Sequence, residues 1–177
     1  MRKTIVSISL LLGALTFASA QQSPPSTETV SIGGKTVTVK YAAPSVRGRE
    51  GKLFGKDGRI ASDPGYPVWR AGANAATLLT AGGTLQIGSL SVPAGSYTLF
   101  VNIEDPNNWE LIVNKQTGQW GLRYDKSQDL GRVKMTMSKP AAMVEKLKYT
   151  LADAGGGKGK LTLEWENHSA SVSFTVK

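Results

Sequence analysis

The sequence predicts an all-β protein, a single antiparallel β-sandwich that is jelly-roll-like or barrel-like, with about nine to ten strands, one long loop and little helix. Apolar and polar residues alternate at a period of two through most of the chain, which is the period of a strand with one buried face. Turn signals recur about every 8–12 residues, as in sandwiches and barrels. The chain contains no cysteine, so strand pairing and core packing must hold the fold without disulfides.

Residues 1–20 have the three parts of a secretory signal peptide. Two basic residues precede an apolar run over residues 5–17, and a small-residue cleavage site ends at Ala20. The run is shorter than the ~20 residues of a membrane-spanning helix, so we expect no transmembrane anchor in the mature chain. The sequence therefore predicts an exported protein, periplasmic or secreted, with a flexible tail over residues 21–28 and a single domain over residues 29–177.

Strands are expected in order along this domain, starting with a hairpin over residues 29–41. Apolar residues alternate on both sides of Gly33 and Gly34, and a glycine pair with positive φ suits a two-residue hairpin turn. Residues 139–146 allow one or two helical turns, because Pro140 stands at an early helical position. The strand alternation continues in seven further segments: residues 84–92, 95–103, 108–114, 131–138, 146–151, 160–167 and 170–177.

The exception is the stretch of residues 42–69, which is rich in glycine and proline and shows no sustained alternation. A connection of this length is usually a functional loop or a lid. Its end runs into VWRAGANAAT, residues 68–77, which combines an indole, a guanidinium and an amide with small residues.

Charge and composition exclude several classes of function. The formal net charge is +8, and it falls to +6 if the two basic residues of the signal peptide are removed. Outside the cytoplasm a basic surface meets anionic polysaccharide, lipid headgroups or phosphate rather than nucleic acid. The absence of cysteine excludes thiol catalysis, iron–sulfur clusters and cysteine-based zinc sites.

Catalytic residues are hard to find, and we expect none, with no metal and no cofactor. His168 is the only histidine, so sites with several histidines are excluded, and we expect it at the surface or at a strand end. A hydrolase with two carboxylates is the alternative, and the sequence offers three pairs. In one of them, Glu164 and Glu166 flank Trp165, which predicts that both glutamates face water. The pairs are Glu104/Asp105, Asp125/Asp129 and Glu164/Glu166.

Arginines, aromatic residues and an asparagine in and after the long loop form the candidate ligand-binding set. Guanidinium groups bind carboxylate or phosphate through paired hydrogen bonds, and indole faces stack on guanidinium groups or sugar rings. The alternative is a structural clasp, in which Arg70 stacks on Trp69 or Trp120 and pairs with Asp63 or Asp125. The candidate residues are Arg47, Arg49, Trp69, Arg70, Asn74, Trp120, Tyr124 and Arg132.

Five segments carry a resemblance to a known family: YAAPSVRGR, VWRAGANAAT, VPAGSYTLF, WELIVNKQTGQWG and the late LEWEN with SVSFTVK. Together they resemble domain-of-unknown-function family 2911, a family of exported bacterial proteins. The resemblance extends from about Val30 to Val176 and implies an exported β-domain without an assigned activity.

Three hypotheses of function follow. The first is a non-catalytic extracytoplasmic binding domain for a small anionic ligand, a glycan or another envelope protein. The second is the carboxylate-dependent hydrolase, acting on cell-wall or extracellular polymer. The third is a structural or assembly protein.

Overall fold

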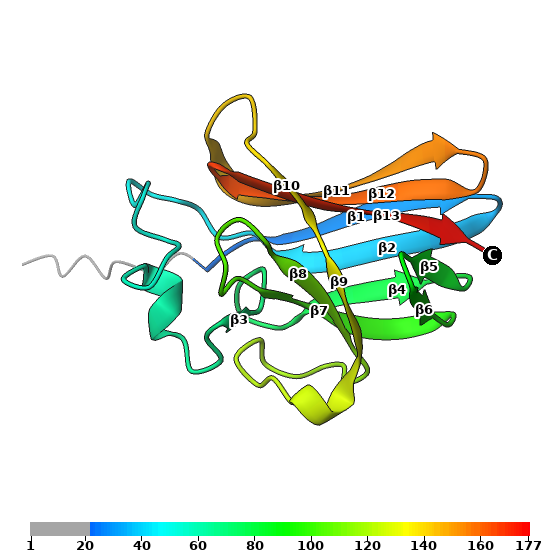
Figure 1. The fold of residues 1–177 in the computed structure, drawn as a ribbon, viewed down its shortest axis with the longest axis horizontal. Coiled ribbons are helices and arrows are strands. Elements are labelled where there is room, and N and C mark those ends of the chain that lie inside the picture. The colour runs from blue at the N-terminus through cyan, green and yellow to red at the C-terminus, as the bar shows by residue number, and fades with distance from the viewer. Residues whose placement is uncertain (1–21) are drawn as a thin grey trace, which may run out of the picture.

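The computed structural model describes residues 22–177 as two antiparallel β-sheets packed together (Figure 1). The predicted signal peptide and its cleavage site lie outside the described residues. Within residues 22–177 the sheets stay separate and do not close into a barrel, so the predicted all-β sandwich is confirmed. No helix in this part of the chain is long and apolar enough to cross a membrane.

The first sheet has seven strands, and its order shows which segments lie side by side. Six strands form the path β1-β2-β4-β7-β8-β9, and β3 pairs with β7. Their bounds are β1 Pro25–Ile32, β2 Lys35–Ala42, β3 Val68–Trp69, β4 Thr77–Ala81, β7 Gly95–Asn102, β8 Glu110–Asn114 and β9 Asp129–Lys134.

The second sheet has six strands and contains the C-terminal third of the domain. Five strands form the path β11-β12-β13-β5-β6, and β10 pairs with β13. Their bounds are β5 Leu85–Ile87, β6 Leu90–Val92, β10 Thr136–Ser138, β11 Val144–Gly155, β12 Lys158–Glu166 and β13 His168–Val176.

Several element boundaries differ from the sequence-based expectation. The strand expected over residues 131–138 divides into β9 and β10, which belong to different sheets, with Met135 buried between them. β1 begins at Pro25, so residues 25–28, which were assigned to the tail, pair with β2. The helical turns expected over residues 139–146 do not form, because Val144 already pairs with β12.

The core lies between the two sheets, and the alternation identified most of it. Leu99 and Val101 of β7 and Leu161 and Leu163 of β12 are all buried, as their period-two spacing predicted. These side chains belong to one continuous apolar cluster, as in a sandwich whose inner faces interdigitate.

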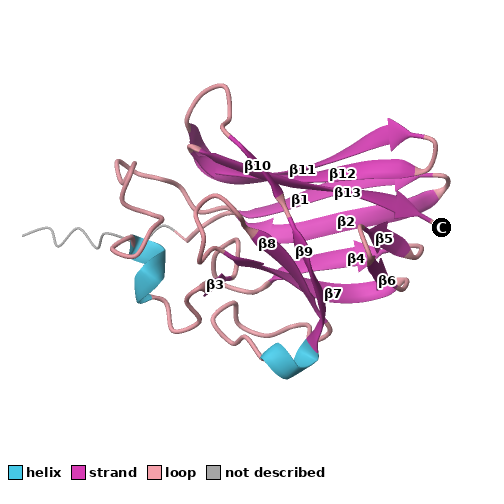
Figure 2. Cartoon of the chain, in the orientation of Figure 1, coloured by secondary structure: helices cyan, strands magenta, loops and turns pink. Residues whose placement is uncertain are grey.

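The long loop, residues 43–67, lies at the end of the sandwich opposite the β11–β12 turn (Figure 2). It contains one short 3-10 helix, η1, Arg59–Ser62. A second short 3-10 helix, η2, Lys126–Gln128, precedes β9. Leu53 and Ile60 are buried and anchor the loop in the core.

Candidate functional site

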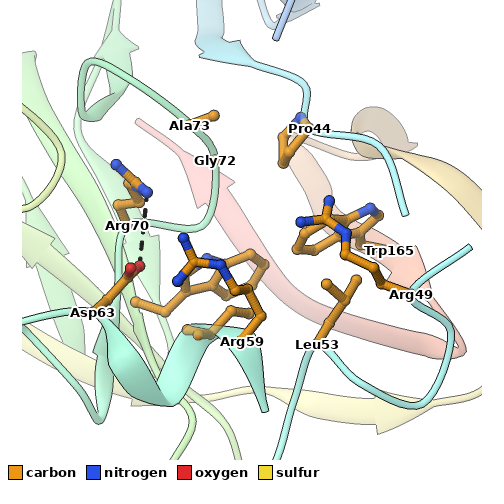
Figure 3. A pocket seen from close by; sticks show the side chains of 11 residues that line it. Pro44, Arg49, Leu53, Arg59, Asp63, Arg70, Gly72, Ala73 and Trp165 are labelled. Atoms are coloured by element: carbon orange, nitrogen blue, oxygen red, sulfur yellow. Dashed lines mark ion pairs between the residues drawn. The ribbon is translucent and has the colours of Figure 1, made fainter. Parts of the chain in front are cut away.

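Three arginine side chains surround one cavity at the loop end of the sandwich (Figure 3). Arg49 and Arg59 come from the long loop, and Arg70 follows β3. Asp63 is the one acidic residue among the described lining residues. The cavity has a volume of about 130 Å³. We call it the arginine cavity, and its lining is Pro44, Arg49, Leu53, Arg59, Ile60, Asp63, Trp69, Arg70, Gly72, Ala73 and Trp165.

Arg49 is fixed in place by the backbone of its own turn. Its Nε donates to the carbonyl oxygen of Val46 at 2.8 Å, and its Nη2 donates to the carbonyl oxygen of Ser45 at 2.7 Å. Because these bonds hold the planar group before any ligand arrives, less side-chain entropy is lost on binding.

The other two guanidinium groups are held more loosely. Arg59 is exposed, and its Nη1 donates to Ser62 Oγ at 2.6 Å. Arg70 Nη2 lies 3.7 Å from Asp63 Oδ2, which is an ion pair but longer than a hydrogen bond. Arg70 Nε is buried and has no hydrogen-bond partner among residues 22–177. A buried donor of this kind is costly unless a ligand or water accepts its hydrogen.

Two stacked indoles form the apolar floor of the arginine cavity. The ring centroids of Trp69 and Trp165 are 5.8 Å apart, and their planes differ by 12°. Both side chains are buried, and Leu53 and Ile60 complete the apolar wall. The cavity therefore combines a cationic rim with an apolar interior.

The segment of residues 68–77 is a tightly bonded turn as well as a cavity wall. Ala71 has φ 44°, and its carbonyl oxygen accepts from Tyr149 Oη at 2.9 Å and from Thr77 Oγ1 at 3.2 Å. The N–H of Gly121 donates to the Asn74 carbonyl oxygen at 2.9 Å. These bonds tie the segment to both sheets, and of the contacts predicted for Arg70 in a structural clasp the ion pair with Asp63 is present.

Arg47, Asn74 and Trp120 lie outside the arginine cavity. Arg47 is exposed, and its backbone N–H donates to Glu145 Oε1 at 3.0 Å. Asn74 lines a different, shallow cavity beside β2 and β4. Trp120 is 50% exposed, and its backbone pairs with that of Ala75 in an isolated antiparallel β-bridge.

Tyr124 and Arg132 form a separate network around the carboxylate of Asp129. Tyr124 Oη donates to Asp129 Oδ2 at 2.6 Å, and Arg132 Nη2 lies 3.1 Å from the same oxygen. Burial, followed by the bond to Asp129, raises the pKa of Tyr124 to about 12. The eight predicted residues therefore separate, and only Arg49, Trp69 and Arg70 line the arginine cavity.

The first two candidate carboxylate pairs have local bonding partners. Asp105 accepts from the N–H of Asn107 and from Asn108 Nδ2, and these bonds lower its pKa. Asp125 accepts from Ser127 N and Oγ, which lowers its pKa as well. Such bonds are typical of turns.

The third pair corrects the expectation that Glu164 and Glu166 share a wet face. Glu164 faces out and pairs with Lys148 at 2.9 Å. Glu166 is 2% exposed, because its φ of 55° breaks the strand alternation and turns the carboxylate inward. Its Oε1 accepts from the N–H of Gly51 at 2.5 Å.

His168 is at a strand end, as expected, but it is not a solvated surface residue. It begins β13 and stacks on Trp109, with centroids 5.3 Å apart and planes 11° apart. Phe54 packs on the ring at 4.5 Å. His168 lines a second cavity of about 170 Å³. Within residues 22–177 no group of three or more histidine, aspartate or glutamate side chains lies close enough to hold a metal ion.

A family model matches residues 23–174 of the chain. The chain belongs to the family described as protein of unknown function (DUF2911). The resemblance found in the sequence is thereby confirmed. Searches of the curated proteins and of the solved structures found no significant match.

In this DUF2911 domain, sequence reasoning missed one arginine of the cavity. Arg59 lies in the same irregular stretch as Arg47 and Arg49, and that composition was the available signal. Trp165 was recognised as a core residue, but nothing in its strand pattern indicated that it also meets the loop arginines.

Proposed function

We propose that the chain is a non-catalytic binding domain that takes a small organic anion into the arginine cavity. The observation that carries the proposal is that three arginines line one cavity with a single carboxylate. Guanidinium groups match the planar or tetrahedral oxygens of carboxylate and phosphate. The buried Nε of Arg70, without a partner in the described chain, offers a donor that such a ligand satisfies.

The size and walls of the cavity narrow the class of ligand. Three arginines and one aspartate give the lining a formal charge of +2. Its volume of about 130 Å³ is slightly smaller than the ~150 Å³ of a cavity that holds one benzene molecule in another protein. Leu53 and Ile60 accommodate a short apolar body beside the charged group. A short-chain carboxylate or a small phosphate ester fits this description better than a glycan.

The hydrolase and the assembly protein receive no comparable support. Asp105 and Asp125 are held by turn hydrogen bonds, and Glu164 and Glu166 point in different directions. Among residues 22–177, none of the contacts described above favours an envelope protein over a small ligand in the cavity. We therefore keep the anion-binding domain as the one proposed function.

We also propose that the domain works outside the cytoplasm, in the periplasm or as a secreted protein. The support is the pattern of residues 1–20 and the cysteine-free composition. A basic cavity in that compartment has access to anionic metabolites and to anionic parts of the envelope.

The test is a binding titration with acetate, butyrate, inorganic phosphate and sulfate. Calorimetry measures the affinity, and amide NMR shifts locate the binding site. We expect at least one of these probes to bind and to shift amides around Arg49, Arg59 and Arg70. Arg70→Gln should weaken binding at least about ten-fold, since charge-assisted hydrogen bonds contribute about 1.5–3 kcal/mol each. Asp63→Asn should strengthen binding, because it removes the carboxylate that competes for Arg70.

Arg123→Gln is the matched control, because Arg123 is exposed, lies outside the cavity lining and carries the same charge. If Arg123→Gln weakens binding as much as Arg70→Gln, only the net charge of the protein attracts the anion. That outcome, or the absence of any shift near the three arginines with all four probes, contradicts the proposal.

A further inference from the structure

The second cavity contains the only histidine of the chain in an unusual setting. His168 contacts both Trp109, stacked at 5.3 Å, and Phe54, at 4.5 Å, and these two rings contact each other at 5.1 Å. Phe54 also contacts Trp69 and Trp165 at centroid distances of 5.4 and 5.9 Å. The imidazole therefore packs against two aromatic rings, and Phe54 connects it to the indoles of Trp69 and Trp165.

A buried carboxylate lies behind this imidazole. Glu166 Oε2 is 3.4 Å from His168 Nδ1, and the glutamate side chain is 3% exposed. Oε1 of the same group is bonded to the N–H of Gly51. His168 Nδ1 is itself buried and has no shorter contact with a hydrogen-bond partner in residues 22–177. The carboxylate is thus within ion-pair distance of Nδ1 without forming a hydrogen bond to it.

The charge of Glu166 determines which ring nitrogen carries the proton. A bare lone pair on Nδ1 facing a carboxylate is repulsive, whereas an Nδ1–H group is attracted. We therefore assign the neutral Nδ1–H tautomer, which leaves a lone pair on Nε2, on the side of the ring away from Glu166. Burial lowers the pKa of His168, which keeps the ring neutral and Nε2 an acceptor at neutral pH.

The cavity that meets this ring is mostly apolar and holds about 170 Å³. An apolar cavity of about 150 Å³ in another protein holds one benzene molecule, so a single six-membered ring with a small substituent fits. Glu104 and Lys56 are exposed and have opposite charges, so the lining has no net charge apart from His168. The described lining is Phe54, Gly55, Lys56, Tyr66, Ile103, Glu104, Pro106, Trp109 and His168.

We propose that this cavity is a second ligand site, which takes a small neutral phenol whose hydroxyl donates a hydrogen bond to His168 Nε2. The ring of the ligand packs against Phe54, Tyr66 and Trp109. The described linings of this cavity and of the arginine cavity share no residue. The two proposals therefore rest on different residues and are tested separately, although Phe54 contacts Trp69 and Trp165 of the arginine cavity.

The chemistry of the lining favours a phenol over a hydrocarbon or a sugar. A hydrocarbon that displaces water leaves the Nε2 lone pair unsatisfied, at a cost of about 1–3 kcal/mol. A sugar brings several hydroxyl groups into a lining with few polar partners, and each unpaired hydroxyl is costly to bury. A phenol has one hydroxyl for the one fixed acceptor and an apolar ring for the walls.

The experiment follows the two imidazole nitrogens by ¹⁵N NMR, since His168 is the only histidine. In the free protein we expect Nδ1 to be protonated and Nε2 not. Titration with 4-methylphenol should move the Nε2 signal toward the position of a hydrogen-bonded nitrogen. Toluene, which has the same shape without the hydroxyl, should bind at least about ten-fold more weakly and leave Nε2 unshifted.

Glu166→Gln tests the tautomer, and Glu164→Gln on the same strand is its control. The glutamine amide donates to Nδ1 while its carbonyl accepts from Gly51, so the ring proton moves to Nε2 and 4-methylphenol binding falls. Glu164 faces out toward Lys148, so Glu164→Gln should change neither the tautomer nor the affinity.

A protonated Nε2 in the free protein would overturn the proposal, and so would equal binding of toluene and 4-methylphenol, or tighter binding of glucose than of 4-methylphenol. An unshifted Nε2 signal at saturating 4-methylphenol would do so as well. If Glu166→Gln does not fold, the wild-type titration still decides between these outcomes.

Discussion

Burial at His168 connects a single side chain to the stability of the whole domain. The pKa of His168 is lowered below its usual 6.5, mainly by burial, and also by Lys139, while Glu166 acts in the opposite direction. The long 3.4 Å distance to Glu166 explains why burial outweighs the attraction. The unfolded chain, with its ordinary pKa, therefore binds a proton more strongly than the folded one.

The sign of the resulting pH dependence follows from linkage. The contribution of neutral His168 to the free energy of unfolding is complete above about pH 6.5, the pKa in the unfolded chain. It is lost as the pH falls from there toward the lower pKa of the folded protein. Urea unfolding between pH 8 and pH 5.5 should show this decrease, and His168→Gln should remove it. A folded-state pKa above 6.5, read from the NMR titration of His168, would contradict the assignment.

Backbone conformation explains why single residues were misjudged from the sequence. Glu166 was expected to face water, because it stands two positions from Glu164 in an alternating strand. Its left-handed φ of 55° reverses the face, and left-handed glutamate is rare enough that no sequence pattern signals it. The contact between His168 and Glu166 depends on this reversal, so the environment of His168 could not be predicted from the sequence either.

At the scale of elements, the alternation predicted most strands and missed a central one. β4 buries Thr77, Leu79 and Ala81, while Leu78 lies on the opposite face, beside another cavity. The inward position of a threonine and the outward position of a leucine conceal the period of two. Thr77 is tolerated in the core because its hydroxyl donates to the Ala71 carbonyl oxygen.

The long loop was located correctly from its composition, but its contacts could not be inferred. Arg49 and Arg59 line the same cavity as Arg70 because Leu53, Phe54 and Ile60 pack the loop against the apolar core. Contacts between residues so distant in sequence depend on the pairing of the whole fold. The arginine cavity therefore became visible only in three dimensions.

Phe54 is the side chain that holds this loop in place, since it contacts Trp69, Trp109, Trp165 and His168. Phe54→Ala should cost about 2–3 kcal/mol, less than the roughly 3–5 kcal/mol for a fully buried phenylalanine, because Phe54 is only partly buried. The side chains of Lys52, Lys56 and Arg59 are already exposed, but the loop should then open locally and let the backbone at these residues enter the active site of trypsin. Limited proteolysis with mass spectrometry measures this cleavage.

Leu151→Ala is the control for this prediction. Leu151 is also partly buried against the core, but it lies on β11 and lines a small cavity of about 10 Å³ that contains no residue of the long loop. A comparable loss of stability without cleavage in the loop is expected. If both variants are cut equally fast at Lys52, Lys56 and Arg59, global unfolding rather than loop docking controls access.

At the scale of the molecule, one apolar core joins both sheets and the long loop. The arginine cavity and the His168 cavity both include residues of this loop, at the end opposite the β11–β12 turn (Figure 2). A sandwich places its variable loops at the ends of a rigid frame, and binding residues concentrate there. The arrangement therefore places both proposed ligand sites at one end of the sandwich, on a frame formed by the two sheets.

The proposed export has a consequence for the whole molecule, because processing must leave this frame intact. The first strand begins at Pro25, and the Pro24 carbonyl oxygen accepts from the N–H of Ala43 at 2.8 Å. Cleavage after Ala20 would leave the whole of β1 and the hydrogen bond between Ala43 and Pro24 in the mature chain. We expect the protein recovered from the periplasm or medium to begin at Gln21 on N-terminal sequencing. Its urea midpoint should equal that of a chain produced from Gln21 and refolded, with or without reductant, since the sequence contains no cysteine. Recovery of the chain from the cytoplasm with Met1 still present would contradict export. A urea midpoint of the exported protein below that of the refolded chain would contradict the view that processing leaves the sandwich intact.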